Sequence, residues 1–156
     1  MSLTTNKNFL QPTGFRVIID REKYANLEFF AQSVNHPGSA VDAREIPLAK
    51  LQNLPIGGDK ISYAELSINL IVDEDMTAYK EMQSWLERTV AENDTTSLYN
   101  DITVVILTSH NNANQQIRYK NCIPVSIGTI EFTSTAGDTT FITFDATFRY
   151  SEFEIQ

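Results

Sequence analysis

Residues 64–75 read AELSINLIVDED, and this stretch carries the clearest structural signal in the chain. Apolar side chains occupy the even positions from 64 to 72, while Glu65, Ser67 and Asn69 occupy odd positions between them. Successive side chains of a β-strand point to opposite faces of its sheet. The period of two therefore predicts a strand with one buried face and one face turned towards solvent.

A helix over residues 76–90 is expected to follow this strand directly. The acidic run Asp73-Glu74-Asp75 favours a helix start, because carboxylates accept hydrogen bonds from the first amides and face the positive end of the helix dipole. A Ca²⁺ loop is the weaker interpretation, since no central Gly and distal Glu continue the pattern. Apolar side chains then recur at spacings of three and four, as on one face of a helix. The residues expected to face the core are Met76, Tyr79, Met82, Trp85, Leu86 and Val90.

Segments on both sides of this strand and helix read as further strands. Phe15–Ile19 is rich in β-branched residues and is bounded by turn formers. Thr139–Tyr150 alternates in the same way as residues 64–72. The other expected strands are Leu27–Val34, Ala40–Ile46, Ile102–Thr108, a segment from Ile117 past Pro124, and a stretch with Ile127, Ile130 and Phe132 that ends at a hairpin turn over Thr135–Asp138.

Together these elements predict a mainly β (α+β) fold. The expected architecture is an antiparallel β-sandwich or barrel of about seven strands with one flanking helix. A chain of 156 residues is long enough for one substantial core. It contains no internal repeat and no low-complexity tract. We therefore expect a single domain over residues 1–156, with the helix covering an open end or edge of the sheet.

Residues 47–60 form a long stretch without a regular period. Pro or Gly occurs at four of these positions, which favours a loop over a strand or a helix. Loops of this length inside compact domains are often functional. The segment is nonetheless apolar, and exposed apolar surface of this kind usually marks a contact. Either its own domain or a neighbouring subunit covers it, and the candidate interface residues are Leu48, Leu51, Leu54 and Ile56.

Charge and composition exclude several functional classes. Twelve Lys and Arg against twenty Asp and Glu give a formal net charge of −8, which disfavours binding to phosphate backbones by counterion release. No apolar run approaches the ~18 residues that a membrane span needs, and the first ten residues lack the apolar core of a secretion signal. Cys122 is the single cysteine, so an intrachain disulfide is excluded, and its apolar neighbours predict a buried thiol. These features favour a protein that works or assembles in a cytoplasm.

No pattern in the sequence predicts catalysis. His36 and His110 are the two histidines, and each lies in a turn-like segment without the spacing of a ligand set. A Ser–His–Asp set formed only in space stays open, but no Gly-x-Ser-x-Gly elbow surrounds a serine. Gly57-Gly58-Asp59-Lys60 lacks the frame of a phosphate-binding loop and precedes a strand. We therefore predict no enzymatic activity, no catalytic residues, no cofactor and no metal site.

Two linked stretches of sequence resemble a known family in the order of their motifs. The stretches are Asn35-His36-Pro37-Gly38 after Phe29–Ser33, and Pro55–Tyr63 followed by Leu66–Met76, Tyr79 and Trp85-Leu86. In chain order, these stretches predict a strand, a Pro-Gly break, a long loop, a Gly-Asp pair, a second strand, an acidic turn and a helix that carries aromatic residues. Over about residues 15–90, this order resembles the tail tube proteins of contractile-tailed bacteriophages and their baseplate relatives.

The resemblance implies a β-barrel or sandwich flanked by a helix and a long loop, in a protein that assembles into hexameric rings. Such rings stack into a tube through which DNA passes. The implied function is that of a structural virion protein of the phage tail, assembled in the host cytoplasm and needing no cofactor. The implied partners are further copies of the chain, other tail and baseplate proteins and the tail sheath, with no membrane. An acidic balance agrees with a lumen that DNA crosses without specific binding.

Two alternatives to the main tube subunit stay open. Within the family, the chain is a baseplate tube initiator or a tail terminator, although initiators often carry additional domains that 156 residues do not accommodate. Outside the family, it is a small β-sandwich that binds a ligand or a carbohydrate. Such a module needs an exposed aromatic platform, whereas most aromatic residues here fall on predicted core faces. The main tube subunit is the prediction that the residues favour.

Overall fold

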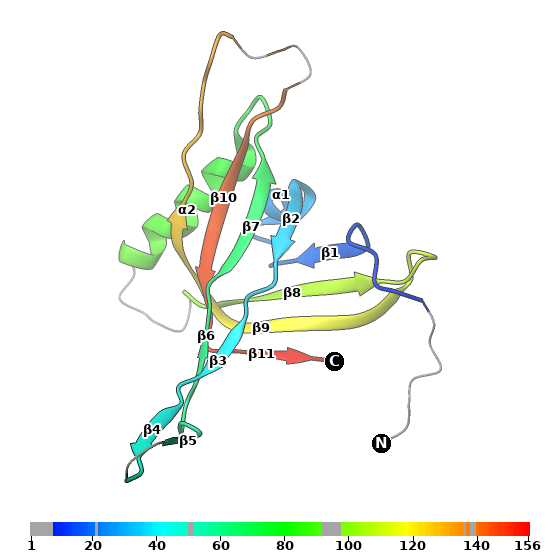
Figure 1. Cartoon of the computed structure of the whole chain (residues 1–156). Helices are drawn as coiled ribbons and strands as arrows, with labels where there is room; N and C mark the ends of the chain where they lie inside the picture. Colours follow the sequence, from blue (N-terminus) through cyan, green and yellow to red (C-terminus); the bar gives the residue numbers. More distant parts are fainter. Residues whose placement is uncertain (1–7, 21, 50–51, 92–97, 136, 138–139) are drawn as a thin grey trace.

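The computed structural model describes residues 8–20, 22–49, 52–91, 98–135, 137 and 140–156 (Figure 1). Strands dominate the chain, and one long helix lies beside them. In chain order, the elements are β1 (Phe15–Ile18), α1 (Ala25–Phe29), β2 (Ala31–Asn35), β3 (Ser39–Val41), β4 (Arg44–Pro47), β5 (Asn53–Ile56), β6 (Ile61–Tyr63), β7 (Leu66–Ile71), α2 (Thr77–Ala91), β8 (Asn100–Leu107), β9 (Ala113–Ile127), β10 (Thr143–Arg149) and β11 (Glu152–Ile155).

The principal sheet is antiparallel and contains seven strands in the order β1-β8-β9-β10-β7-β2, with β11 also paired to β9. β9 is 15 residues long and joins the two parts of this sheet. Its earlier part pairs with β8 and β11, and its later part pairs with β10. Figure 1 shows that β1, β8 and β11 consequently run across the direction of β2, β7 and β10. The mainly β class with one principal helix is therefore confirmed.

The sheet does not close into a barrel within the described part of the chain. Its two end strands, β1 and β2, pair with β8 and β7 respectively and not with each other. β11 pairs on one side only, with β9. Edge strands present unpaired N–H and C=O groups. The fold is thus an open and strongly bent sheet with three edges on which another chain can pair.

The strand predicted from alternation corresponds to β7. Leu66, Ile68 and Leu70 are buried, while the residues between them are partly exposed. β7 lies between β10 and β2, and Ile68 stands opposite Ala146 in the antiparallel register. The apolar face recognised in the sequence is therefore the face that enters the hydrophobic core.

Helix α2 supplies the centre of the core through Trp85. The indole ring stacks on Tyr24 with centroids 4.6 Å apart and lies 5.3 Å from the ring of Phe148. Its N–H donates to the carbonyl oxygen of Leu98 at 3.4 Å, which satisfies the polar group of a buried ring. Tyr24 lies between the strands predicted at Phe15–Ile19 and Leu27–Val34, and its ring is buried.

The acidic run before α2 acts as a helix cap. The carboxylate of Asp73 accepts hydrogen bonds from the amide of Thr77 at 2.8 Å and from its hydroxyl at 2.6 Å. The bond from the Thr77 side chain is the main cause of a pKa of Asp73 below its ordinary value. The capping interpretation of this run therefore agrees with its geometry.

The strand predicted at Leu27–Val34 is wrong over its first half. Residues Ala25–Phe29 form helix α1, and the strand begins only afterwards. The amide of Leu27 donates to the Glu81 carboxylate of α2 at 3.2 Å, and the side chain of Asn26 donates to the same carboxylate at 2.5 Å. Contact with α2 overrides the local β propensity of this aromatic segment.

The long loop predicted at residues 47–60 is also wrong. The chain between positions 39 and 63 forms two short antiparallel ladders, β3 with β6 and β4 with β5. The strand predicted at Ala40–Ile46 is divided between β3 and β4. Pro47 and Pro55 both lie within the second ladder. Each strand of an isolated pair has a free edge, where a missing N–H costs no ladder hydrogen bond.

The later part of the chain follows the prediction except at its ends. The strands predicted at Phe15–Ile19 and Ile102–Thr108 are present as β1 and β8, but β10 begins at Thr143. The stretch with Ile130 and Phe132 is irregular chain after β9. The predicted hairpin turn lies partly outside the described residues. β11 is an unpredicted strand that pairs with β9, and the Lys120 ammonium lies 3.0 Å from the Glu152 carboxylate across that pair.

Candidate functional site

The two short ladders form a projection, referred to below as the ribbon (residues 39–49 and 52–63). Figure 1 shows it extending away from the lower end of the principal sheet. Between Ser39 and Ser62, every described residue except Gly58 is exposed. A two-stranded ribbon without further layers is only marginally stable in water. Among the described strands, β4 and β5 of the ribbon are exposed along their whole length, so they need a partner to bury their apolar side chains.

One face of the outer ladder is apolar. Ile46 stands opposite Leu54, and Arg44 stands opposite Ile56. Residues two apart in a strand share a face, so these four side chains lie on the same side. Ile46, Leu54 and Ile56 are 45 %, 49 % and 42 % exposed. The set of Arg44, Ile46, Leu54 and Ile56 is referred to as the ribbon face.

The opposite face of the same ladder is polar or carries proline. Glu45 stands opposite Pro55, and Pro47 stands opposite Asn53. The Asn53 amide donates to the Glu45 carboxylate at 2.8 Å. The outer ladder is therefore amphipathic, and the ribbon face is the side with apolar surface available for a neighbour.

Gly58 allows a close backbone approach between the two strands of the ribbon. A Cβ atom at this position would lie 2.0 Å from the carbonyl oxygen of Asp42. Two residues separate β3 from β4, whereas the four residues Gly57–Lys60 separate β5 from β6. An unequal count of this kind bends a ladder, as in a β-bulge. The requirement for glycine at position 58 thus follows from the close approach of the two chain segments.

The base of the ribbon is held by an aromatic cluster. The Tyr63 ring lies 5.8 Å from Tyr150 and 5.4 Å from Phe153 of β11. His36 lies just before β3, forms a hydrogen bond with the Tyr119 hydroxyl at 2.6 Å, and meets the Phe153 ring edge-on at 5.0 Å. Burial raises the pKa of Tyr119, so that hydroxyl stays protonated. Both strands that enter the ribbon are therefore anchored to the sheet, while the outer ladder is not.

The predicted interface residues lie in this projection wherever the structure describes them. Leu54 and Ile56 belong to the ribbon face, and Leu48 is an exposed residue just beyond β4. Leu51 lies outside the described residues. The sequence analysis missed Ile46, the cross-strand partner of Leu54, because it treated residues 47–60 as aperiodic. The signal that could have revealed this strand was the spacing of two between Leu54 and Ile56.

Only some of the residues predicted to form the core face of the helix are buried in α2. Met82 and Trp85 are buried, whereas Tyr79 and Leu86 are partly buried. The prediction is wrong for Val90, which is 86 % exposed. Val90 lies in the last turn of α2. Helical spacing alone does not reveal where the neighbouring sheet ends.

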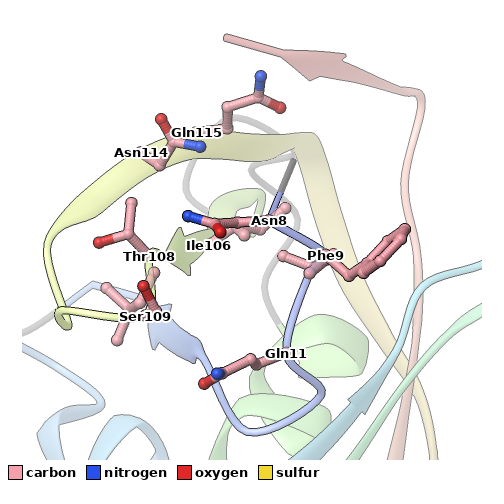
Figure 2. A pocket seen from close by; sticks show the side chains of 10 residues that line it. Asn8, Phe9, Gln11, Ile106, Thr108, Ser109, Asn114 and Gln115 are labelled. Atoms are coloured by element: carbon pink, nitrogen blue, oxygen red, sulfur yellow. The ribbon is translucent and has the colours of Figure 1, made fainter. Parts of the chain in front are cut away.

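The described residues show no arrangement suited to catalysis or metal binding. No three His, Cys, Asp or Glu side chains among them are placed to hold a metal ion. The cavity in Figure 2, of about 270 Å³, is lined by amide and hydroxyl side chains such as Gln11 and Asn114 together with apolar ones such as Phe9 and Ile106. Burial raises the pKa of Cys122 to about 12, so its thiol is not a reactive thiolate. Among the described helices, none has the length and apolar character needed to cross a membrane.

Several solved structures share this fold. The chain is similar to one in the sheath–tube complex of an extracellular contractile injection system in its extended state, with 16 % identity, a TM-score of 0.75 and 99 % of each chain covered. It is also similar to a chain in the tube-terminating cap of the anti-feeding prophage, with 13 % identity, a TM-score of 0.76 and coverage of 99 % and 95 %. The crystal structure of an Hcp protein matches with 9 % identity, a TM-score of 0.54 and coverage of 92 % and 98 %.

The sequence itself is matched by a family model. No curated protein sequence is significantly similar to the chain. The model described as phage tail tube protein, however, matches residues 2–156. This family consists of structural tube proteins, so the chain is a structural protein and not an enzyme. The open sheet, the single long helix and the match over nearly the whole sequence lead to one assignment: the chain belongs to the phage tail tube protein family.

Proposed function

We propose that this chain is the main subunit of a tail tube and that its copies form hexameric rings, which stack to build the tube. The observation that carries the proposal is the ribbon face, whose apolar side chains are half-exposed on a projection that no described part of the chain covers. Family membership supports this class of assembly. In this proposal residues 1–156 act as one tube domain, and the interface includes Leu48, Leu51, Leu54 and Ile56.

Contact with a neighbouring copy stabilises both the ribbon and the assembly. Each Å² of apolar surface removed from water contributes roughly 25 cal/mol, and the two-stranded ribbon gains a second layer. The ribbon face and the surface that receives it are different parts of the chain. Such a heterologous contact generates a closed ring or a helical stack. The edges of β1, β2 and β11 offer further backbone groups for pairing between copies.

The proposal extends to a contractile tail. Chains with the same fold come from a sheath–tube complex, a tube-terminating cap and a baseplate. These relatives support partners of the same kinds, namely a tail sheath and other tail and baseplate proteins. A baseplate initiator and a tail terminator remain the alternatives, since the cap relative and the tube relative match almost equally well, with TM-scores of 0.76 and 0.75. We favour the main subunit because the chain has a projection at each end for a copy on either side.

The proposed tube lies in the virion tail, after assembly in the host cytoplasm, and DNA crosses its lumen without specific binding. With a net charge of −8, the chain has fewer basic than acidic side chains. Counterion release, which drives tight binding to phosphate backbones, needs an excess of basic side chains. The excess of acidic side chains therefore supports a lumen that lets DNA pass and does not bind it tightly.

The test replaces the central pair of the ribbon face by Ile46→Asp combined with Leu54→Asp. Two carboxylates then occupy positions where a neighbour packs, and burial of an unpaired charge is strongly unfavourable. We expect a folded protein with an unchanged circular dichroism spectrum that forms no tubes. Light scattering and negative-stain microscopy of variant and wild type measure the difference.

The matched control is Ala40→Asp combined with Ser62→Asp, which places two charges at directly opposed positions of β3 and β6, away from the ribbon face. This control is expected to assemble. A wild-type protein that stays monomeric at high concentration and several salt strengths contradicts the proposal and favours the ligand-binding alternative. If the test variant unfolds, the ribbon belongs to the domain's own core. If the test variant still forms tubes, the ribbon face is not part of the interface.

A further inference from the structure

The chain projects at two opposite ends in Figure 1. The ribbon extends at one end, and the connection between β9 and β10 extends at the other. The described part of this connection, residues 128–135, 137 and 140–142, is referred to as the distal loop. Like the ribbon face, it carries large exposed apolar side chains, since Phe132 is 74 % and Phe141 is 58 % exposed.

The distal loop is anchored at both of its ends. The N–H of Gly128 donates to the carbonyl oxygen of Asp145 at 2.6 Å, and the N–H of Val72 donates to the carbonyl oxygen of Ile142 at 2.9 Å. Ile130 packs against the hydrophobic core. The two exposed phenylalanines are therefore presented on a segment whose ends the sheet holds in place.

A cavity of about 500 Å³ opens in the distal loop. Its lining combines the ring of Phe141 with the side chains of Glu131 and Ile142 and several threonines. Such a lining offers apolar surface together with one carboxylate. It is chemically suited to an apolar segment that carries a cation.

The ribbon face and the distal-loop cavity carry opposite charges. Arg44 is part of the ribbon face, and its exposed guanidinium forms no ion pair or side-chain hydrogen bond with the described residues. Glu131 is likewise exposed and without a side-chain partner in the described part of the chain. Each surface therefore combines one charged side chain with exposed apolar side chains, and the two charges are opposite in sign. Surfaces of this kind are complementary.

We propose that the ribbon face of one copy packs into the distal-loop cavity of the next copy along the tube, with Arg44 paired to Glu131 of that copy. This inference rests on the proposed function, because it names the partner of the ribbon face. The two surfaces lie at opposite ends of the chain, so the contact repeats head to tail without closing on itself. The apolar side chains supply the buried surface, and the ion pair sets the register between successive rings.

Charge reversal tests this pairing directly. Arg44→Glu alone and Glu131→Arg alone each bring like charges together. Each is expected to raise the protein concentration needed for tube formation by at least about tenfold. The double variant restores opposite charges, and coupling between contacting residues is expected to return that concentration to within about threefold of wild type. Sedimentation of tubes and negative-stain microscopy measure the concentration.

Lys80→Glu is the matched control, because it reverses one exposed cation on α2, outside both projections. It is expected to form tubes like wild type, and thermal unfolding verifies that every variant is folded. Phe132→Ser combined with Phe141→Ser provides a second test that leaves the charges unchanged and is expected to prevent stacking.

Three outcomes separate this inference from the function on which it rests. Single charge variants that form tubes as readily as wild type overturn the pairing. A folded double variant that does not recover overturns it as well. In both cases wild-type tubes leave the proposed function intact, whereas a wild-type protein that forms no tubes removes the proposed function itself.

Discussion

β7 and the outer ladder of the ribbon have similar patterns but opposite environments. Both alternate apolar residues with others, yet Leu66 and Ile68 are buried, whereas Ile46 and Leu54 are about half-exposed. β7 has a strand on each side and contributes to the core cluster together with α2. β4 and β5 pair only with each other. Alternation therefore identifies a face that needs burial, and the place of the strand in the fold decides whether its own chain or a neighbour provides it.

The largest effect is expected from Trp85→Ala, at the centre of the buried region. The indole ring lies between Tyr24 and Phe148, and replacing a buried aromatic ring by alanine costs about 3–5 kcal/mol. The domain is expected to unfold or to lose its assembly, which chemical denaturation followed by circular dichroism measures. Trp85 is the single tryptophan, so native emission reports on this site. Red-shifted and readily quenched emission would mean that the ring is exposed.

A smaller loss is expected from Glu81→Ala, which removes the contact between α1 and α2. The Glu81 carboxylate accepts hydrogen bonds from the Leu27 amide and the Asn26 side chain. Hydrogen bonds to charged groups contribute about 1.5–3 kcal/mol, and that range is the expected loss of unfolding free energy. Glu87→Ala is the control, because the Glu87 carboxylate accepts a hydrogen bond from the Gln83 side chain on the exposed surface of the same helix. Equal losses for the two variants would contradict the role of Glu81 in positioning α1.

A change that depends on pH is expected from Asp73→Ala at the start of α2. Hydrogen bonds from Thr77 lower the pKa of Asp73 below its ordinary value of 3.8. A lowered folded-state pKa adds stability above the unfolded-state pKa, and that stability is lost as pH falls through the folded-state pKa. Wild type is therefore expected to melt above the variant at neutral pH, with the gap narrowing under strongly acidic conditions. A gap in melting temperature that stays constant with pH would exclude the charge of Asp73 as its source.

The smallest effect on folding is expected from Leu54→Ala in the ribbon. In the unassembled chain, truncation of this half-exposed side chain is expected to change the unfolding free energy by less than about 0.5 kcal/mol. The same truncation at buried Leu70 is expected to cost about 2–5 kcal/mol. Denaturation of both variants under conditions that keep the protein monomeric measures the contrast. Similar costs would remove the distinction between the core and the ribbon.

The candidate site was predictable in its location but not in its form. Apolar residues among Pro and Gly at positions 47–60 pointed to a contact surface, and Leu54 and Ile56 do lie on an exposed apolar face. The pairing of Ile46 with Leu54 was not predictable, because two prolines and a glycine pair argued against a ladder. The distal loop was also missed, since the sequence analysis assigned Phe132 and Phe141 to strands.

The sequence by itself determined the mainly β class, the strand β7 and the capped helix α2, because side-chain periodicity and capping are properties of residues close together in the chain. Only the tertiary structure decided the helical state of α1 and the open course of the sheet. The contact of Leu27 with Glu81 and the pairing of Lys120 with Glu152 join residues far apart in sequence. The exposure of the ribbon face was decided in the same way, because burial depends on which elements come to lie against a strand, and no local pattern contains that information.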